Sequence, residues 1–200
     1  MTHKVHVKFY AADASGVSHH DFVPVLHTWI QSRAVADHVL IDVNDYSHVH
    51  NGPGTLLVAH EANFYLDTLD GFLGLSYSRK QPLADGGASF ADNLRYAFAA
   101  ALEACQRLEQ DPSLAGRLKF RTDEATVKLN DRLAAPNTAE TFQQVRPELD
   151  RVAAQLWPGA TVDIEHYPGE LALFEARLRS SDPADVATLL SRIATPAASR

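Results

Sequence analysis

The amino-acid sequence predicts an α+β fold in which antiparallel sheets carry helices on one face. Short runs of alternating apolar and polar residues, typical of half-buried strands, are interspersed with longer runs that have apolar residues at helical spacing. Turn sequences such as Asn51-Gly52-Pro53-Gly54 separate neighbouring strand runs. The resulting order is β-α-β-β-β-α followed by β-α-β-β-α. It predicts two packed lobes, residues 1–112 and 113–200, with one continuous domain as the alternative.

The first lobe is expected to build its sheet from an N-terminal strand and a central three-strand block. Val5, Val7 and Phe9 alternate with polar residues, so they are expected to face a core. The last helix of this lobe ends where Asp111 and Pro112 interrupt its apolar stripe. We predict strands at residues 4–10, 38–50, 58–67 and 73–80, and helices at 18–36 and 89–110.

The central block predicts its own register. With four-residue turns at 51–54 and 68–71, Asp42 falls opposite Asn63, and Asn63 falls opposite Ser76. On the other face Ile41 meets Phe64. Polar residues then face polar residues throughout, and a slip by one residue would reverse every side chain.

The second lobe is predicted from weaker signals. Asn137 and Glu140 resemble a capping box that opens a helix, and Pro147 is expected to kink that helix or start a new one. Asp182 and Pro183 precede a final helix. We predict one strand or a short hairpin within 116–131, a helix from 137 to 157, a hairpin of 161–166 with 171–179, and a helix from 182 to about 193.

Composition excludes several classes of function. The chain has 200 residues and a formal charge of -7, so it lacks the basic surface expected of a nucleic-acid-binding protein. A single cysteine, Cys105, excludes a disulfide framework and a zinc–cysteine cluster. No apolar run reaches the length of a membrane span, and the first residues enter a strand pattern directly. We therefore expect a cytoplasmic protein with no membrane partner.

The polar face of the central block is the leading candidate for binding. Two asparagines lie at mid-strand beside carboxylates, where asparagine is disfavoured, and this hints at a role beyond solvation. A small polar ligand is the expected partner, and a homodimer formed through the same face is the alternative. The predicted ligand-binding residues are Asp42, Asn44, Tyr46, Asn63, Tyr65, Ser76, Ser78 and Lys80, with Lys4, His6, Lys8 and Glu61 on the same face.

A histidine-rich hairpin is the rival candidate. His48 and His50 are two residues apart, so on a strand they would share a face and could bind one divalent transition metal ion. In that case His60 or Glu61 would act as the base for a metal-activated water, and the protein would be a hydrolase. The HExxH signature is absent, and exposed or hydrogen-bonded histidines are the simpler interpretation.

The same register places Asp45, His60 and Arg79 in one row. An aspartate that orients a histidine is part of a catalytic triad. No nucleophile accompanies the pair, because Cys105 lies on an alanine-rich helix where it is best explained as core filling. A satisfied histidine with an ion pair at its rim is therefore favoured over a catalytic one.

The segments DYSHVHNGPG, LVAHEANFYLD and GLSYSRK, within Val5 to Lys80, resemble a family of uncharacterised bacterial proteins of similar length. The resemblance implies no activity. The sequence thus predicts a small-ligand-binding or partner-binding protein, with a metal-assisted hydrolase as the alternative.

Overall fold

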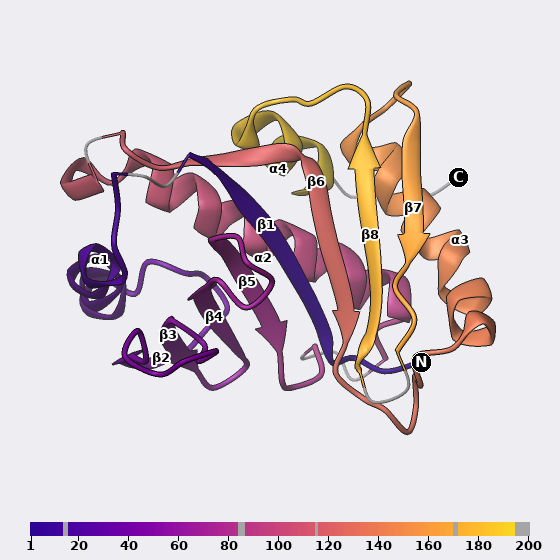
Figure 1. The fold of residues 1–200 in the computed structure, drawn as a ribbon, viewed down its shortest axis with the longest axis horizontal. Coiled ribbons are helices and arrows are strands. Elements are labelled where there is room, and N and C mark those ends of the chain that lie inside the picture. The colour runs from indigo at the N-terminus through magenta and orange to yellow at the C-terminus, as the bar shows by residue number, and fades with distance from the viewer. Residues whose placement is uncertain (14–15, 84–86, 115, 170–171, 195–200) are drawn as a thin grey trace.

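A computed structural model describes residues 1–13, 16–83, 87–114, 116–169 and 172–194. Within these residues the chain forms one eight-stranded antiparallel sheet and four α-helices, which confirms the α+β class (Figure 1). The strand order is β2-β3-β4-β5-β1-β6-β8-β7. The strands are β1 Val5–Asp13, β2 Leu40–Asp45, β3 Thr55–Ala59, β4 Ala62–Asp67, β5 Gly74–Arg79, β6 Lys119–Leu129, β7 Val162–His166 and β8 Phe174–Ser180. The helices are α1 His19–Ser32, α2 Phe90–Gln110, α3 Ala139–Leu156 and α4 Val186–Ala194, with a 3-10 turn at Pro112–Leu114.

The two predicted halves share this sheet. Val7 in β1 pairs with Val127 in β6, so the sheet continues from one half into the other. One hydrophobic core likewise contains Phe98 from the first half and Trp157 from the second. The halves are therefore joined through β1 and β6, and they do not form two separate sheets.

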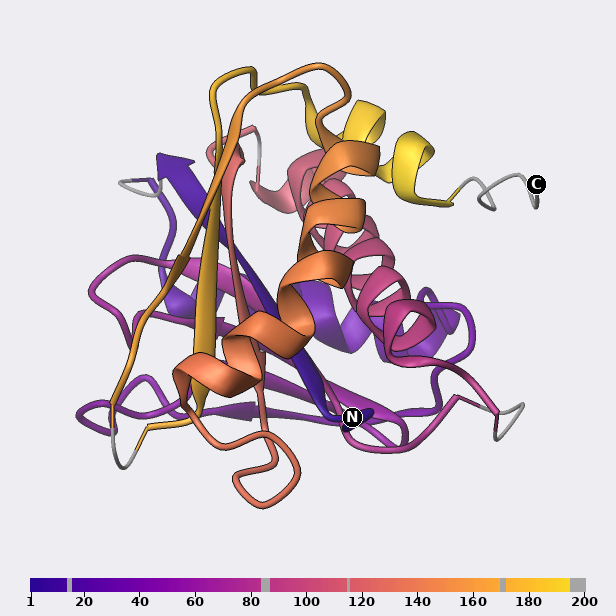
Figure 2. The same cartoon turned by 90° about the vertical axis from the view of Figure 1, so that its right-hand side faces the viewer.

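Helices cover one face of the sheet and leave the other open. Val5, Val7 and Phe9 are fully buried, as predicted, and the Phe9 ring meets the Phe98 ring of α2 edge-on at 6.0 Å. In Figure 2 α2, α3 and α4 lie together on one side of the strands. The other face of the sheet, called the open face here, is turned toward the viewer in Figure 1. Strand side chains that point away from the helices lie on this open face.

The central block contains four strands where three were expected. A tight turn at His60 and Glu61 separates β3 from β4, so the predicted strand 58–67 is split and the strand 38–50 stops at Asp45. This two-residue turn also reverses the alternation, because Leu57 and Ala59 are buried before it and Ala62 and Phe64 after it. The turn lacks glycine, proline and asparagine, which explains why the sequence pattern did not reveal it.

The predicted register of the block is wrong. Asn63 pairs with Ser78 and Phe64 with Tyr77, so β5 is displaced by two residues from the expected alignment. A shift of two residues keeps each side chain on its face, so Asn63 and Ser78 still lie on the open face. Asp42 pairs with Val58 in β3 and does not meet Asn63.

Strand β2 also departs from the predicted alternation. Its pairing with β3 skips Ile41, which is the extra residue of a β-bulge between Leu40 and Asp42. Val39 and Ile41 are consequently 62% and 56% exposed, although Ile41 was expected to meet Phe64 on the apolar face. A bulge on an edge strand is a common means of preventing further strand pairing.

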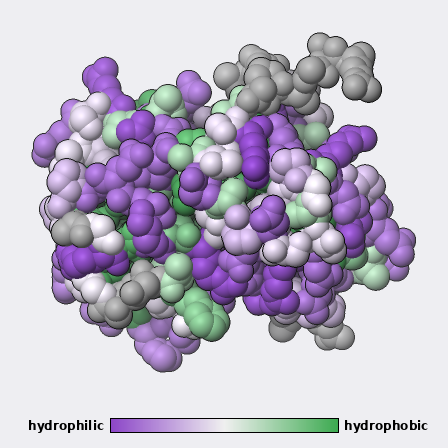
Figure 3. Space-filling view, turned by 90° about the horizontal axis from the view of Figure 1, so that it is seen from above, coloured by the Kyte–Doolittle hydropathy of each residue, from purple (hydrophilic) through white to green (hydrophobic). Residues whose placement is uncertain are grey.

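The helix ends are set by local caps. Ser89 accepts a hydrogen bond from the backbone N–H of Asp92 and so begins α2. The cap of α3 is Thr138, one residue after the predicted Asn137, and Pro147 lies within this helix without dividing it. No described helix has the length and apolar character needed to cross a membrane. Viewed from above, the surface is largely hydrophilic with small apolar areas (Figure 3).

Candidate functional site

The open face is richest in polar contacts where β1, β6 and β8 lie side by side. His6, Lys8 and Tyr10 of β1 point to this face, as the alternation predicts, because the residues between them are buried in the core. The loop from Thr68 to Leu73, which joins β4 to β5, closes over the end of β1 and hydrogen-bonds to it through Ala11. Two ion networks form beneath and beside this loop.

The first network is centred on Lys8, whose side chain is only 3% exposed. Its Nζ donates to Asp67 Oδ1 at 2.8 Å, Asp70 Oδ1 at 2.6 Å and the Phe72 carbonyl at 3.2 Å. Ser76 donates to the other oxygen of Asp67 at 2.7 Å. All three ammonium protons of Lys8 therefore have close acceptors, and the β4–β5 loop is fastened to β1.

The electrostatics of this network favour the ionised form of Asp70. Burial alone would raise the pKa of Asp70, but its hydrogen bond to Lys8 and the charge of Lys8 outweigh burial and lower that pKa. Burial raises the pKa of the Tyr10 hydroxyl, which lies 2.6 Å from Thr126 Oγ1. Tyr10 is therefore a neutral hydrogen-bonding group on this face.

The second network is centred on Glu124 of β6, which is 7% exposed. Arg121 holds it at 3.0 Å and also makes two 3.1 Å hydrogen bonds to Asp123. Arg177 and Arg179 of β8 reach Glu124 only at 3.4 Å each. Glu124 is thus held closely by one arginine and loosely by two others.

Arg177 is the least satisfied member of the second network. Its Nε is buried and has no hydrogen-bond acceptor, because the 3.4 Å contact with Glu124 is an ion pair without hydrogen-bond geometry. Its next carboxylate, Glu175, is 3.6 Å away and pairs more closely with Lys128, at 3.0 Å. The guanidinium also lies over the Tyr167 ring, 4.6 Å from the ring centroid.

A cavity of about 230 Å³ lies between these two networks. Its lining contains three arginines, Glu124 and Asp70 together with two aromatic side chains. The Phe72 ring is 68% exposed and stands edge-on to the Tyr10 ring at 6.5 Å. The lining residues are Tyr10, Ala11, Asp70, Phe72, Arg121, Glu124, Arg177 and Arg179.

The predicted ligand-binding residues that lie within strands share the open face, but the predicted set does not converge on one point. Ser76 and Ser78 are buried, and Ser76 belongs to the Lys8 network. Asn63 donates to the Tyr65 hydroxyl at 2.9 Å, while its own Oδ1 is buried without a partner. Lys80 donates to the Ala59 carbonyl at 2.5 Å, a contact within the sheet.

Two carboxylates of the predicted site serve the backbone of edge strand β2. Asp42 accepts from the Val43 N–H at 2.9 Å, and Asn44 contacts Asp42 at 3.5 Å. Glu61 accepts from the Val39 N–H at 2.8 Å. These contacts satisfy N–H groups that an edge strand would otherwise expose, so a structural role accounts for both carboxylates.

The histidine hairpin does not assemble as predicted. His48 and His50 lie in the turn after Asp45, so strand alternation does not place them on one face. They line a cavity of about 490 Å³ together with His19 and Tyr46. Within the described ranges, no group of three or more histidine, cysteine, aspartate or glutamate side chains is placed to bind a metal ion.

His60 and Glu61 lie at the opposite end of β3 from His48 and His50. Five residues of strand separate the two turns, a distance of about 13 Å along the chain. The predicted row of Asp45, His60 and Arg79 is also wrong, because Asp45 pairs with Thr55 and its carboxylate contacts His20 at 3.1 Å. Both differences arise because β2 ends at Asp45 and pairs with β3, so the turn at residues 60 and 61 lies at the far end of β3.

Arg79 instead joins a buried cluster on the helical side of the sheet. It donates to the Tyr77 hydroxyl at 3.3 Å and lies over the Tyr96 ring at 4.9 Å. His38 lies 3.1 Å from the same hydroxyl, and burial lowers its pKa. This cluster fixes the chain that enters β2.

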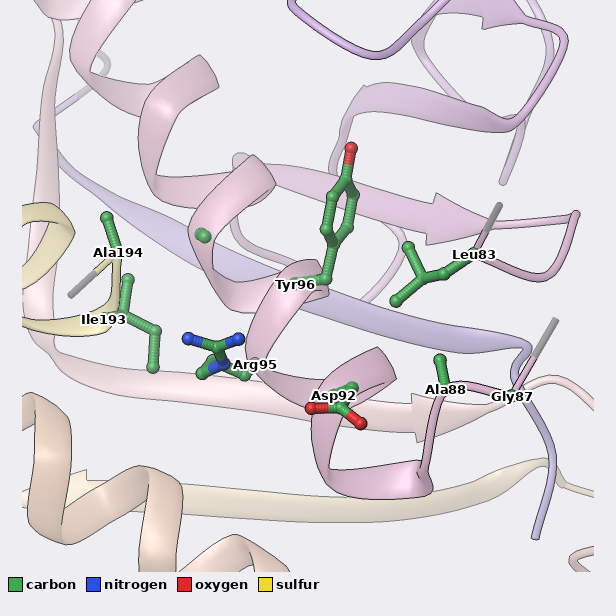
Figure 4. Close-up of a pocket in the computed structure, with 9 residues that line it drawn as sticks. Leu83, Gly87, Ala88, Asp92, Arg95, Tyr96, Ile193 and Ala194 are labelled. Atoms are coloured by element: carbon green, nitrogen blue, oxygen red, sulfur yellow. The ribbon is translucent and has the colours of Figure 1, made fainter. Parts of the chain in front are cut away.

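Tyr96 borders a larger cavity, of about 630 Å³, between α2 and the end of α4. Asp92, Arg95 and Tyr96 point in different directions there, so its polar groups do not converge (Figure 4). Leu83, Gly87 and Ala194 in its wall each adjoin a segment outside the described residues. The smaller cavity beside Glu124 therefore has the better-defined chemistry.

The residues around Glu124 were not among the predicted site residues. Arg177 and Arg179 alternate with the buried Ala176 and Leu178, so their outward position could have been read from the sequence. Arg121 and Glu124 are three residues apart and share a face only because the β1–β6 pairing is irregular in this region. Their proximity to Tyr10 depends on that long-range pairing.

Comparison with models of known protein families, with curated proteins and with solved structures finds no match for this chain.

Proposed function

We propose that this protein binds a small anionic ligand on the open face of its sheet, in the cavity between Tyr10, Phe72 and the arginines of β8. The observation that carries the proposal is the incomplete pairing of Arg177, whose buried Nε has no acceptor. Buried guanidinium groups are normally hydrogen-bonded, because a lost hydrogen bond to a charged group is costly. A ligand oxyanion in the cavity would offer the Arg177 guanidinium a further acceptor.

Arginine suits this role because its planar fork matches a carboxylate or a phosphate with two parallel hydrogen bonds. Arg177 and Arg179 are only two residues apart on β8, so they present their guanidinium groups on the same face. Their contacts with Glu124 are 3.4 Å long, so a ligand would displace little. Arg121, by contrast, is engaged by Asp123 and serves to hold Glu124.

The competing explanation is an ion network that only stabilises the sheet. The two explanations differ in what small anions do, because a purely structural network has no saturable site. We therefore expect the Arg177 side-chain Nε–H resonance of ¹⁵N-labelled protein to shift and saturate with sodium acetate or sodium phosphate. Sodium chloride at equal ionic strength is the reference, because screening alone affects all exposed pairs.

The variant Arg177→Gln should abolish the saturable response at the neighbouring Arg179 resonance. The matched control is Arg151→Gln, which removes an exposed arginine paired with Glu148 on α3. That control should respond as the unmodified protein does. Equal responses to chloride, acetate and phosphate, or an unchanged titration of Arg177→Gln, would contradict the proposal. A response to acetate but not to phosphate would identify a carboxylate site, and the reverse a phosphate site.

Self-association through the same face is a second candidate, because Leu69 and Phe72 are 58% and 68% exposed on the β4–β5 loop. A dimer formed there would cover the cavity. Sedimentation velocity of the unmodified protein and of the variant Phe72→Asp distinguishes self-association from ligand binding. Self-association is supported if the unmodified protein is a dimer and the variant is a monomer. A monomer in both leaves the cavity free for a ligand. No arrangement of the described residues favours the metal-assisted hydrolase.

A further inference from the structure

We infer that the anion bound in this cavity is a carboxylate carried on a flat ring, with Phe72 as the side chain that stacks on the ring. This inference rests on the proposed function and concerns the class of ligand. Its starting point is the mixed lining of the cavity. The lining combines the side chains of Arg177 and Arg179 of β8 with those of Phe72 and Tyr10.

Phe72 is exposed on a loop that is held firmly in place. Lys8 contacts the carboxylates of Asp67 and Asp70 and the carbonyl of Phe72, all within 3.2 Å. The Leu73 carbonyl also accepts from the Ala11 N–H, so the backbone that carries the ring is fastened to β1. An aromatic side chain has only two rotatable bonds, so the 68% exposed Phe72 loses little conformational freedom when a second ring covers it.

The volume of the cavity sets the size of the ligand. An apolar cavity of about 150 Å³ accommodates benzene. The present cavity of about 230 Å³ therefore has space for one six-membered ring and one carboxylate group. A nucleotide or a peptide of several residues would extend far beyond it.

The charges of the lining favour one negative charge over two. Glu124 and Asp70 remain in the wall beside the three arginines, so the lining has a formal charge of +1. A doubly charged phosphate would be repelled by both carboxylates, whereas a carboxylate carries a single charge. An arginine fork also matches the planar carboxylate with two hydrogen bonds.

The test compares sodium benzoate, cyclohexanecarboxylate and acetate on the whole protein, with affinities taken from the titrations of arginine Nε–H resonances. Benzoate should bind about tenfold more tightly than acetate, because stacked aromatic pairs add to simple burial. Cyclohexanecarboxylate, which has a similar size but no flat ring, should fall between them.

Phe72→Leu should weaken benzoate binding about three- to tenfold and should weaken acetate binding by a clearly smaller factor. Phe72→Tyr, which keeps an aromatic ring at this position, should bind benzoate about as tightly as the unmodified protein does. Leu133→Ala is the matched control, because it removes a 97% exposed apolar side chain from the loop after β6. Equal affinities for benzoate and acetate, or equal effects of Phe72→Leu on both, would overturn the ring assignment while leaving anion binding intact. If phosphate binds and none of these three carboxylates does, the carboxylate assignment fails while anion binding stands. If neither phosphate nor any of the three carboxylates binds, the proposed function itself fails.

Discussion

The two ion networks on the open face differ in how completely they are paired. Around Lys8 the three contacts with Asp67, Asp70 and the Phe72 carbonyl measure 2.6–3.2 Å, and the lysine is almost fully buried. Around Glu124 the contacts of Arg177 and Arg179 are 3.4 Å, and a buried Nε has no acceptor. A complete network stabilises a fold, whereas an incomplete one next to a cavity has capacity left for a ligand.

The difference in pairing between the two ion networks is tested first by replacing Lys8. Lys8→Met should lower the free energy of unfolding by about 3–5 kcal/mol, because Asp67 and Asp70 would remain partly buried without a counter-charge. Urea unfolding followed by circular dichroism measures this. Lys119→Met, which breaks the pair between a 62% exposed lysine and Glu109, is the control and should cost less than about 1 kcal/mol. Equal losses in the two variants would mean that the Lys8 network is no more than a surface ion pair.

The second prediction concerns His6, which lies on β1 between Ser78 of β5 and Lys128 of β6. Burial lowers its pKa from 6.5 to about 4, and the nearby Lys128 and Lys8 act in the same direction, against Asp67 and Asp70. Between those pH values the unfolded chain binds a proton that the folded protein does not. Stability is therefore complete above pH 6.5 and falls as the pH decreases to about 4, by at most about 1.4 kcal/mol per pH unit for this group.

His6→Gln should flatten this part of the stability–pH curve, measured by urea unfolding from pH 7 to pH 4. A slope will remain, because burial also lowers the pKa of His38 and of His19. His27→Gln, on the exposed side of α1, is the control and should leave the slope unchanged. If His6→Gln has the slope of the unmodified protein, His6 is not the group that becomes protonated on unfolding.

The third prediction uses Glu124 to separate stability from binding. Glu124→Gln should reduce stability by about 1–2 kcal/mol, less than Lys8→Met, because the arginines around it are 22–44% exposed and reach solvent. The same substitution removes a carboxylate that competes for Arg177 and Arg179, so benzoate should bind several-fold more tightly. Weaker binding would show that Glu124 positions the arginines for the ligand.

Part of this arrangement could be predicted from the sequence. The alternation of Val5, Val7 and Phe9 with His6 and Lys8 identified the two faces of β1 correctly. The outward position of Lys8 was therefore predictable. Its partners were not, because Asp67 and Asp70 reach it through a loop whose path depends on the pairing of β5 with β1.

Several of the errors arise from backbone irregularities, and the displacement of β5 arises because six residues, 68–73, join it to β4 where a four-residue turn was expected. A turn at His60 and Glu61 and a bulge at Ile41 each reverse the alternation without a glycine or proline to mark the position. A further irregularity places Arg121 and Glu124 on one face. The pairing of β1 with β6, which creates the cavity, joins residues more than a hundred positions apart and leaves no local pattern.

The smallest expected change in stability comes from Arg177→Gln, and it tests the comparison most directly. Glu124 would keep Arg121 at 3.0 Å, and the lost contacts measure 3.4 and 3.6 Å, so the free energy of unfolding should fall by less than about 1 kcal/mol. The contact with the Tyr167 ring accounts for part of that loss. The same variant should lose the saturable response to acetate and benzoate. A loss of 3 kcal/mol or more, about that expected for Lys8→Met, would place Arg177 in a structural network and remove the reason for assigning it a ligand.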